Sequence, residues 1–208
     1  MPRTGSSTRD RMLDAAYTVM RTRGLARATT KEIAREAGFS EAALYKHFED
    51  KTALFVAVLV ERLPSRLGRG LDELPARVGT ADVEEVLAEV AADALAFYRE
   101  TFPMGASLFS EPAVLAAHRA ALGRLGAGPH VVVDAVAAYL AAERDAGRVS
   151  DTVDPRAAAL LLLGACQMTA FLESFAGGPA PGNDPADDAA TAAGLARAAV
   201  HGLLPRNP

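Results

Sequence analysis

The sequence predicts an all-α fold. Half of its 208 residues are hydrophobic, alanine is abundant, Trp is absent, and Phe and Tyr are few. Such a composition suits closely packed helices better than sheets, in which aromatic and β-branched side chains are enriched. Apolar residues recur at helical intervals over long stretches, whereas the strict alternation of a half-buried strand and the turn residues of a hairpin are missing.

The first helix is predicted to begin after Ser7. Asp10 follows three residues later, which is the spacing of a capping box. Apolar residues then recur at helical intervals from Leu13 to Met20. Gly24 is expected to end the helix, because glycine readily adopts the left-handed conformation of a C-terminal cap.

Two short helices separated by a tight turn are predicted next. Thr29 and Glu32 have the spacing of a second capping box, and Gly38 ends that helix. Ser40 can cap a third helix over Glu41–His47. Two helices joined in this way form a helix-turn-helix, whose second helix projects from its domain and fits a major groove about 12 Å wide.

The rest of the chain is predicted to form longer helices. Asp50 can cap a fourth helix, which ends before Pro64. The segment Ser65–Thr80 is rich in Gly, Pro and Arg, so we expect a connection with one short helical piece at Leu71–Leu74. Further helices are expected at Asp82–Thr101, Pro112–Leu125, Pro129–Ala146, Asp154–Phe175 and Pro185–Leu203.

The distribution of charge differs between the two parts of the chain. The net charge is −4, yet residues 1–51 hold ten basic and seven acidic side chains, a net +3, whereas the remainder holds twelve and nineteen, a net −7. A basic head on an acidic body is typical of a local DNA contact. We therefore predict a DNA-binding domain at 1–51, a connecting helix at 51–63 and a second helical domain at 64–208.

The predicted helix-turn-helix has an apolar inner side and a polar outer side. The residues expected to face a core shared with the first helix are Ile33, Ala37, Phe39, Leu44 and Phe48. The outer side presents hydroxyls, cations and aromatic rings beside small residues, which suit phosphates and base edges. The candidate DNA-contacting residues are Thr29, Thr30, Lys31, Ser40, Glu41, Ala42, Ala43, Tyr45, Lys46, His47 and Lys51.

The run Leu44-Tyr45-Lys46-His47-Phe48, followed by Lys51, resembles the signature of the tetracycline-repressor (TetR) family. Over about residues 7–60, the helix caps, the turn and the core positions are also similar to the DNA-binding domain of that family. Past Pro64, only the order and length of the helices are similar. The resemblance implies a homodimeric transcriptional regulator, most often a repressor, that a small molecule releases from a pseudo-palindromic operator in double-stranded DNA.

The same resemblance implies roles for single residues. Tyr45 and Lys51 would hold phosphates, and Thr30 would bind another phosphate at the start of its helix. His47 would contact the DNA backbone or a base. The base-facing positions are Lys31, Glu41 and Ala42. Two alternatives stay open for Glu41, which either accepts a hydrogen bond from a cytosine amine or only caps its helix.

Two C-terminal helices, Asp154–Phe175 and Pro185–Leu203, carry wide apolar faces. Small residues on these faces let helices approach closely, so we predict a four-helix seam between two subunits. The alternative is that both helices only fill the core of one chain. The candidate dimer-interface residues are Leu160, Leu163, Gly164, Gln167, Phe171, Leu195, Ala196, Ala199 and Leu203.

The second domain also holds aromatic and soft side chains of the kind that line apolar ligand sites. The candidate ligand-binding residues are Phe97, Phe102, Met104, Phe109, His118, Tyr139, Met168 and Phe171. The alternative for each of them is a core residue, and for His118 an exposed histidine. Pro103 and Gly105 are expected to interrupt the helix between Thr101 and Glu111, where a break could gate a cavity. The domain at 64–208 is therefore predicted to bind a small-molecule effector and to dimerise.

Other classes of protein have little support. The sequence lacks a nucleophile elbow, a phosphate-cradling glycine loop and a His-Glu-x-x-His motif, and its four histidines and one cysteine lack metal-ligand spacing. We therefore expect no enzyme activity, no cofactor and no metal. A structural protein that binds DNA without sequence preference is the remaining alternative, although we would expect such a chain to be basic.

The sequence is expected to belong to a cytoplasmic protein that does not enter a membrane. The single cysteine, Cys166, excludes an internal disulfide and fits a reducing compartment. The polar, basic N-terminus does not resemble a signal peptide. The longest apolar run, Ala157–Leu172, is interrupted by Gln167 and Thr169 and is shorter than the roughly 20 residues that a bilayer requires.

Overall fold

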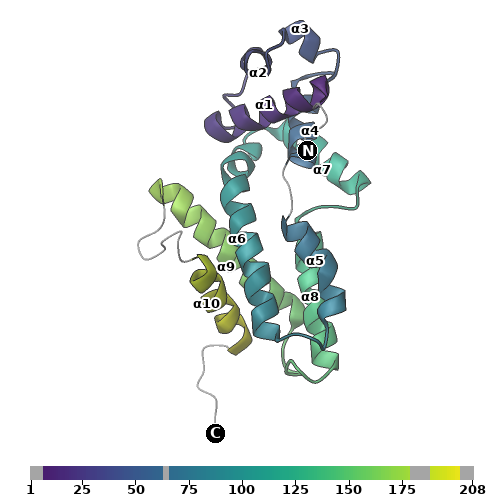
Figure 1. Ribbon diagram of the computed structural model, residues 1–208, viewed down its shortest axis with the longest axis vertical. Helices are drawn as coiled ribbons and strands as arrows, with labels where there is room; N and C mark the ends of the chain where they lie inside the picture. Colours follow the sequence, from purple (N-terminus) through teal and green to yellow (C-terminus); the bar gives the residue numbers. More distant parts are fainter. Residues whose placement is uncertain (1–6, 63–65, 179–187, 202–208) are drawn as a thin grey trace, which may run out of the picture. The chain divides into compact units, whose positions relative to one another are not determined.

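The computed structural model describes residues 7–62, 66–178 and 188–201, and every regular element within these ranges is a helix (Figure 1). This confirms the all-α fold class. The helices are α1 (Thr8–Arg23), α2 (Thr30–Ala37), α3 (Glu41–Leu44), α4 (Lys51–Glu61), α5 (Arg66–Arg77), α6 (Val83–Leu108), α7 (Pro112–Arg124), α8 (Pro129–Asp145), α9 (Pro155–Ala176) and α10 (Asp188–His201). The two ends predicted for the last helix, at Pro185 and Leu203, lie outside the described residues.

The predicted caps fix where the first four helices begin. The Ser7 side chain accepts a hydrogen bond from the backbone N–H of Asp10 at 3.1 Å. Thr29, Ser40 and Asp50 each accept one from a backbone N–H in the first turn of the helix that follows. A cap of this kind is worth about 1 kcal/mol, so the sequence determines these boundaries locally.

The prediction for the third helix was too long. α3 ends at Leu44 rather than at His47, and the next residues form a tighter turn, in which the N–H of His47 bonds the carbonyl of Leu44 at 3.0 Å. The turn brings Phe48 back toward the core, where Leu44 is 0% exposed and Phe48 is 5% exposed. The shorter helix therefore still places both side chains in the core of the first unit.

The connection predicted at Ser65–Thr80 was wrong, because this segment holds the twelve-residue helix α5. Its leucines Leu67, Leu71 and Leu74 stand at helical spacing and are all buried. Pro75 lies inside the helix. Packing of the leucine side therefore outweighs the low helix propensity of the glycines and the proline, which sequence reasoning had weighted more heavily.

The break predicted within Thr101–Glu111 is confined to residues 109–111, so it begins later than expected. α6 runs without interruption to Leu108 and passes through Pro103 and Gly105. A proline inside a helix costs about 3 kcal/mol. Met104, which directly follows Pro103, and Leu108, just over one turn further on, are both buried, and burial of two such side chains offsets a cost of this size.

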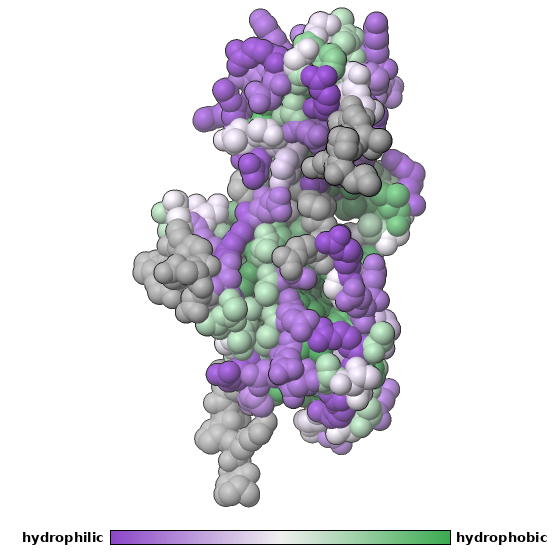
Figure 2. Space-filling model, viewed as in Figure 1, coloured by the Kyte–Doolittle hydropathy of each residue, from purple (hydrophilic) through white to green (hydrophobic). Residues whose placement is uncertain are grey.

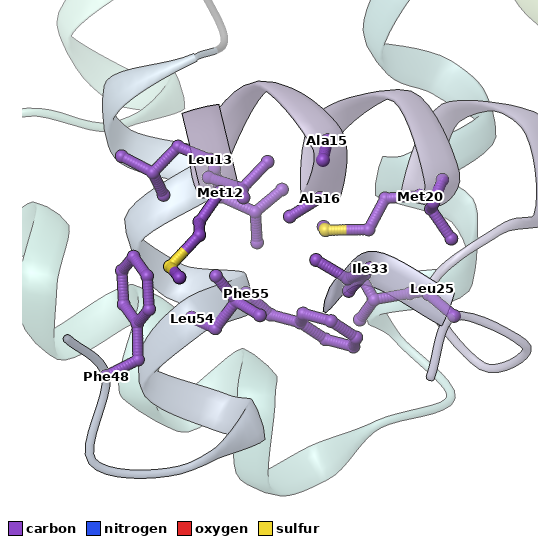
Figure 3. Close-up of a cluster of buried hydrophobic side chains, with 14 of the residues drawn as sticks. Met12, Leu13, Ala15, Ala16, Met20, Leu25, Ile33, Phe48, Leu54 and Phe55 are labelled. Carbon is purple, nitrogen blue, oxygen red and sulfur yellow. The ribbon is translucent and has the colours of Figure 1, made fainter. Parts of the chain in front are cut away.

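The chain packs into two compact units, residues 1–64 with 103–128 and residues 65–102 with 129–208. In the first unit, helices α1 to α4 surround an apolar core (Figure 3). Met104 and Leu108 at the end of α6 also belong to this core. Side chains that fill this core include Met12, Leu13, Ile33, Leu54 and Phe55. The functional division expected at residues 51 and 64 remains a prediction.

The second unit is organised around α9, which packs on α8 and α10, while α5 packs on α8. Arg99 of α6 bonds Glu173 of α9 at 2.6 and 2.8 Å and pairs with Asp188 of α10 at 2.7 Å. On length and apolar composition alone, the 22-residue α9 could cross a bilayer, so the interruptions in its apolar run do not exclude this. A helix that packs on apolar surfaces on two sides has the same composition.

Candidate nucleic-acid interface

The helix-turn-helix is held in place by its own apolar side. Ile33 and Ala37 of α2 and Leu44 of α3 are buried in the core of the first unit, and Phe39 packs against it. Gly38, between the two helices, has a φ of 76°, a left-handed conformation that glycine adopts without strain. Helix α3, the second helix of the motif, is therefore held in place by side chains that face the core.

Arg11 of α1 also secures the turn, and sequence reasoning missed it. Its Nη2 donates to the carbonyl oxygen of Ala37 at 3.2 Å, and its guanidinium lies 4.7 Å from the centre of the Phe39 ring. The side chain therefore bonds the C-terminal end of α2 and covers the aromatic residue that follows. Arg11 is 26 positions before Ala37, and no spacing rule within one helix could have found the pair.

We expect Arg11→Met to lower the free energy of unfolding by about 1 kcal/mol, because a hydrogen bond from a charged donor and a cation–π contact are lost. Urea denaturation of the full chain followed by circular dichroism measures the change. Arg27→Met, which alters an exposed cation of the same unit, is the matched control. Equal changes in the two variants would show that Arg11 does not hold the turn.

Most candidate DNA-contacting side chains lie at the surface. Figure 2 shows that the N-terminal helices are largely hydrophilic on the face in view. The exposed candidates are Thr29, Lys31, Ser40, Glu41, Ala42, Tyr45, Lys46, His47 and Lys51. Ala43 is half-buried, and Thr30, which was expected on the outer side, is only 9% exposed. Thr30 is covered because two residues of the following helix and turn bond its hydroxyl.

Thr30, Glu41 and Tyr45 form a hydrogen-bonded group. The Thr30 hydroxyl donates to Oε1 of Glu41 at 2.5 Å, and the Tyr45 hydroxyl donates to Oγ1 of Thr30 at 3.3 Å. The first turn of α3 is capped by the Ser40 hydroxyl, which accepts from the N–H of Ala43 at 3.2 Å. The Glu41 side chain is therefore engaged with α2 rather than with the start of its own helix.

Several basic residues of the first unit are held in ion pairs. Arg9 pairs with Glu61 at 2.6 Å, and Arg62 pairs with Asp10 at 2.8 Å and with Asp14 at 2.7 Å, so that α4 is tied to α1. Hydrogen bonding to Arg9 lowers the pKa of the Glu61 carboxyl. These ion pairs hold α1 and α4 together. The lysines of the same unit, in contrast, are exposed to solvent.

The exposed lysines of this unit differ from these arginines in their surroundings. Within residues 7–62, Lys31, Lys46 and Lys51 make no ion pair within 4 Å. The ammonium of Lys51 lies 5.0 Å from the centre of the Phe55 ring and remains exposed. Three cations without a carboxylate partner, beside Tyr45 and His47, provide a surface for phosphates.

The predicted dimer residues divide into two groups. Leu160, Gly164, Gln167 and Phe171 lie on the exposed side of α9, together with Leu161, Met168, Leu172 and Phe175. Leu163 and Ala196 are buried within the second unit, while Leu195 and Ala199 are half-buried on α10. Leu203 lies outside the described residues. Apart from Gln167, the exposed group forms an apolar face along one side of α9.

The eight ligand candidates are divided between the two units. Met104, Phe109 and His118 belong to the first unit, and the other five belong to the second. Met104 is a core residue and Phe109 is 72% exposed. His118 is half-buried, and burial lowers the pKa of its imidazole. The described residues offer no partner to its Nδ1.

The five candidates of the second unit also differ in environment. Phe102 and Phe171 meet edge to face with ring centres 5.7 Å apart, and Phe97 meets Tyr98 in the same way at 5.6 Å. Met168 is 55% exposed, whereas Tyr139 is buried. Cys166 is buried too, which raises the pKa of its thiol to about 12, so it is a poor nucleophile. The residues that the structure describes contain no group able to hold a metal ion.

Comparison with known proteins identifies the class. The chain matches the family of bacterial regulatory proteins named tetR over residues 12–58, and the C-terminal domain of AefR-like transcriptional repressors over residues 106–201. The nucleoid occlusion factor SlmA of Vibrio atlanticus is 42% identical over 72 residues, which are 33% of this chain and 37% of SlmA. The HTH-type transcriptional regulator SrpR of Pseudomonas putida is 44% identical over 55 residues, 26% of each chain.

Solved structures share the fold over nearly the whole chain. A TetR-family transcriptional regulator from Mesorhizobium loti superimposes with a TM-score of 0.72 at 19% identity and covers 93% of this chain and 95% of its own. The regulator FadR from Bacillus subtilis, solved with stearoyl-CoA, gives a TM-score of 0.69 at 16% identity and covers 93% and 98%. The similarity to SlmA and SrpR spans only about a third or less of this chain, whereas the fold shared with these solved structures covers 93% of it.

The chain belongs to the TetR family of DNA-binding transcriptional regulators. Proteins of this class are not enzymes.

Proposed function

We propose that the protein is a homodimeric, sequence-specific transcriptional repressor that acts in the cytoplasm and is released from a pseudo-palindromic operator by a small molecule. The observation that supports DNA binding best is the helix-turn-helix, whose apolar side is fixed in the core. Its opposite side exposes Tyr45, Lys46, His47 and Lys51. The second matched family is described as a transcriptional repressor, which favours repression.

The exposed apolar face of α9 supports the homodimer. Large apolar residues on one side of a helix are stabilised when a second subunit covers them. Gly164, in the middle of this face, lets two such helices approach closely. Two helix-turn-helix heads can then bind two half-sites, which one head could not do with useful affinity.

A small-molecule effector is supported by the family and by the relatives of known structure. FadR from Bacillus subtilis was solved with stearoyl-CoA, although its 16% identity shows only a shared fold. In the mechanism that we propose, the molecule binds better to one arrangement of the body helices, and this arrangement has a lower affinity for the operator.

The test is footprinting of the full chain on the DNA upstream of its own gene, followed by a screen of metabolites and lipophilic drugs for loss of the footprint. We expect protection of two half-sites about one helical turn apart. Competition with random DNA separates this function from a structural role. A repressor keeps its operator against a large excess of random DNA, while a protein without sequence preference is displaced in proportion.

A further inference from the structure

Helix α4 is apolar on two opposite sides. From Thr52 to Val60 its sequence contains no charged residue, and Thr52 is the only polar residue of this stretch. One side is buried in the core of the first unit and consists of Leu54, Phe55, Val58 and Leu59. At 3.6 residues per turn, the other apolar residues lie on the opposite side of the helix. These residues are only half-buried, and they are Ala53, Val56, Ala57 and Val60.

A groove with a volume of about 510 Å³ lies along this second side, between α4 and α7 of the first unit. The four half-buried residues form its α4 wall, and Ala117 and Ala121 belong to its α7 wall. The α4 residues are related as i, i+3, i+4 and i+7, so this wall extends over two helical turns, about 10 Å. Two helices with small side chains leave between them the kind of groove in which an amphipathic helix binds.

The rim of the groove carries a cation that its own unit does not neutralise. Arg124 of α7 lines the groove and is exposed, and it makes no ion pair within 4 Å with the residues that the structure describes. The carboxylates on the α4 rim are engaged, since Asp50 caps α4 and Glu61 pairs with Arg9 at 2.6 Å. An acidic side chain of a bound partner would therefore complement Arg124.

The same features argue against two other occupants. A nucleic acid binds to clusters of cations, whereas this groove has apolar walls and one cation that is not engaged. The exposed face of α9 in a second copy offers no acid, because Glu173 is the only carboxylate of α9 and bonds Arg99. In the proposed dimer, that face is also covered by its counterpart. The occupant that fits best is a helix of a different protein.

We propose that the groove between α4 and α7 binds an amphipathic helix of another protein. This helix presents apolar residues with the spacing i, i+3 or i+4, and i+7 to the groove, and an Asp or Glu to Arg124. The meaning of the site for regulation rests on the function proposed above. Lys51, the candidate phosphate contact, lies over Phe55 on the core side of α4, opposite the groove. The partner helix and DNA can therefore bind at the same time, so that the regulator holds its partner at the operator.

The test begins with a phage-displayed library of helical peptides about four turns long, selected on the full chain. We expect the selected peptides to share the apolar spacing and to carry an acidic residue on one flank. One selected peptide, labelled with fluorescein, then serves as the probe. Fluorescence anisotropy measures its affinity for the full chain and for each variant.

Two lysine substitutions locate the binding site. Ala57→Lys places a charge between the apolar walls and should weaken binding of the peptide about tenfold. Ala116→Lys, at an exposed position of α7 that does not line the groove, is the matched control and should leave the affinity unchanged. Lys51→Ala should also bind the peptide as the wild type does, because Lys51 lies on the other side of α4. Thermal unfolding checks that every variant is folded.

A charge exchange tests the contact with Arg124. Arg124→Glu alters an exposed residue and should weaken binding of the acidic peptide about fivefold. A peptide whose acidic residue is replaced by lysine should bind Arg124→Glu better than it binds the wild type. A loss caused only by altered folding would not be restored in this way.

The proposal is overturned if the selection yields no peptide of this pattern, if Ala57→Lys binds the peptide as tightly as the wild type, or if the charge exchange restores nothing. A lower mass of Ala57→Lys than of the wild type in light scattering would also overturn it, since the groove would then be covered by a second copy of the chain.

The function proposed for the whole protein fails differently. If the peptide binds in the groove as expected but the protein does not recognise an operator, the docking site stands and the regulator is not what we propose. If an operator is recognised but no peptide binds in the groove, only the docking site is lost.

Discussion

Lys51→Ala and Tyr45→Ala are expected to weaken binding to every DNA sequence by a similar factor, about a hundredfold in the dimer. In the proposed complex, each variant would remove one phosphate contact per subunit, and a hydrogen bond to a charged group is worth roughly 1.5 kcal/mol or more. Phosphate contacts carry no sequence information, so the loss should be the same for an operator and for random DNA. Fluorescence anisotropy with both DNAs measures it.

The salt dependence distinguishes the two side chains. Lys51→Ala removes one cation per subunit and should reduce the slope of log K against log salt by about two. Tyr45 is neutral, so Tyr45→Ala should lower the affinity with little change of slope. Lys31→Ala serves as a contrasting variant, because a base-facing lysine should change the preferred sequence as well. An unchanged affinity of Tyr45→Ala would mean that this helix does not contact DNA.

Leu161→Glu and Met168→Glu are expected to split the dimer and to reduce operator affinity by at least a hundredfold. The two side chains are 71% and 55% exposed on the apolar face of α9. In a two-fold seam, each substitution buries two carboxylates without partners, at a cost of several kcal/mol. Light scattering should give the mass of one chain, 21.7 kDa, in place of two.

Ala120→Glu, at an exposed position of α7, is the control for added charge. It should leave the mass and the operator affinity unchanged. Dimers that persist in both α9 variants would show that this face is not the interface. A wild-type protein of single-chain mass would remove the dimer from the proposed function.

Local signals predicted the starts of the first four helices well. The starts of α1, α2 and α4 followed from Ser7, Thr29 and Asp50, because a cap is a contact between residues three positions apart. The exposed lysines and Tyr45 also followed, since the inner side of the helix-turn-helix was correctly placed. Contacts between residues close in the sequence are sufficient to predict where a short helix begins, if a side chain at its start caps it.

Features that depend on distant packing could not be predicted. α5 was missed because Gly68, Gly70 and Pro75 outweighed a leucine stripe whose value depends on α8. Arg11 was missed because its partner is 26 positions away. Thr30 was expected at the surface, since only the folded helix-turn-helix places Glu41 beside it. In each case, the deciding contact joins segments that no periodicity connects.

The group formed by Thr30, Glu41 and Tyr45 has a consequence for how an operator would be read. A hydroxyl can donate only one hydrogen bond, and the Thr30 hydroxyl donates to the Glu41 carboxylate. Donation to a phosphate would therefore require this bond to open, and the Glu41 carboxylate would then be free to accept from a base. Binding of a phosphate by Thr30 would thus also release Glu41, the side chain proposed to accept from cytosine, so that holding the strand and reading a base would be coupled through one hydroxyl.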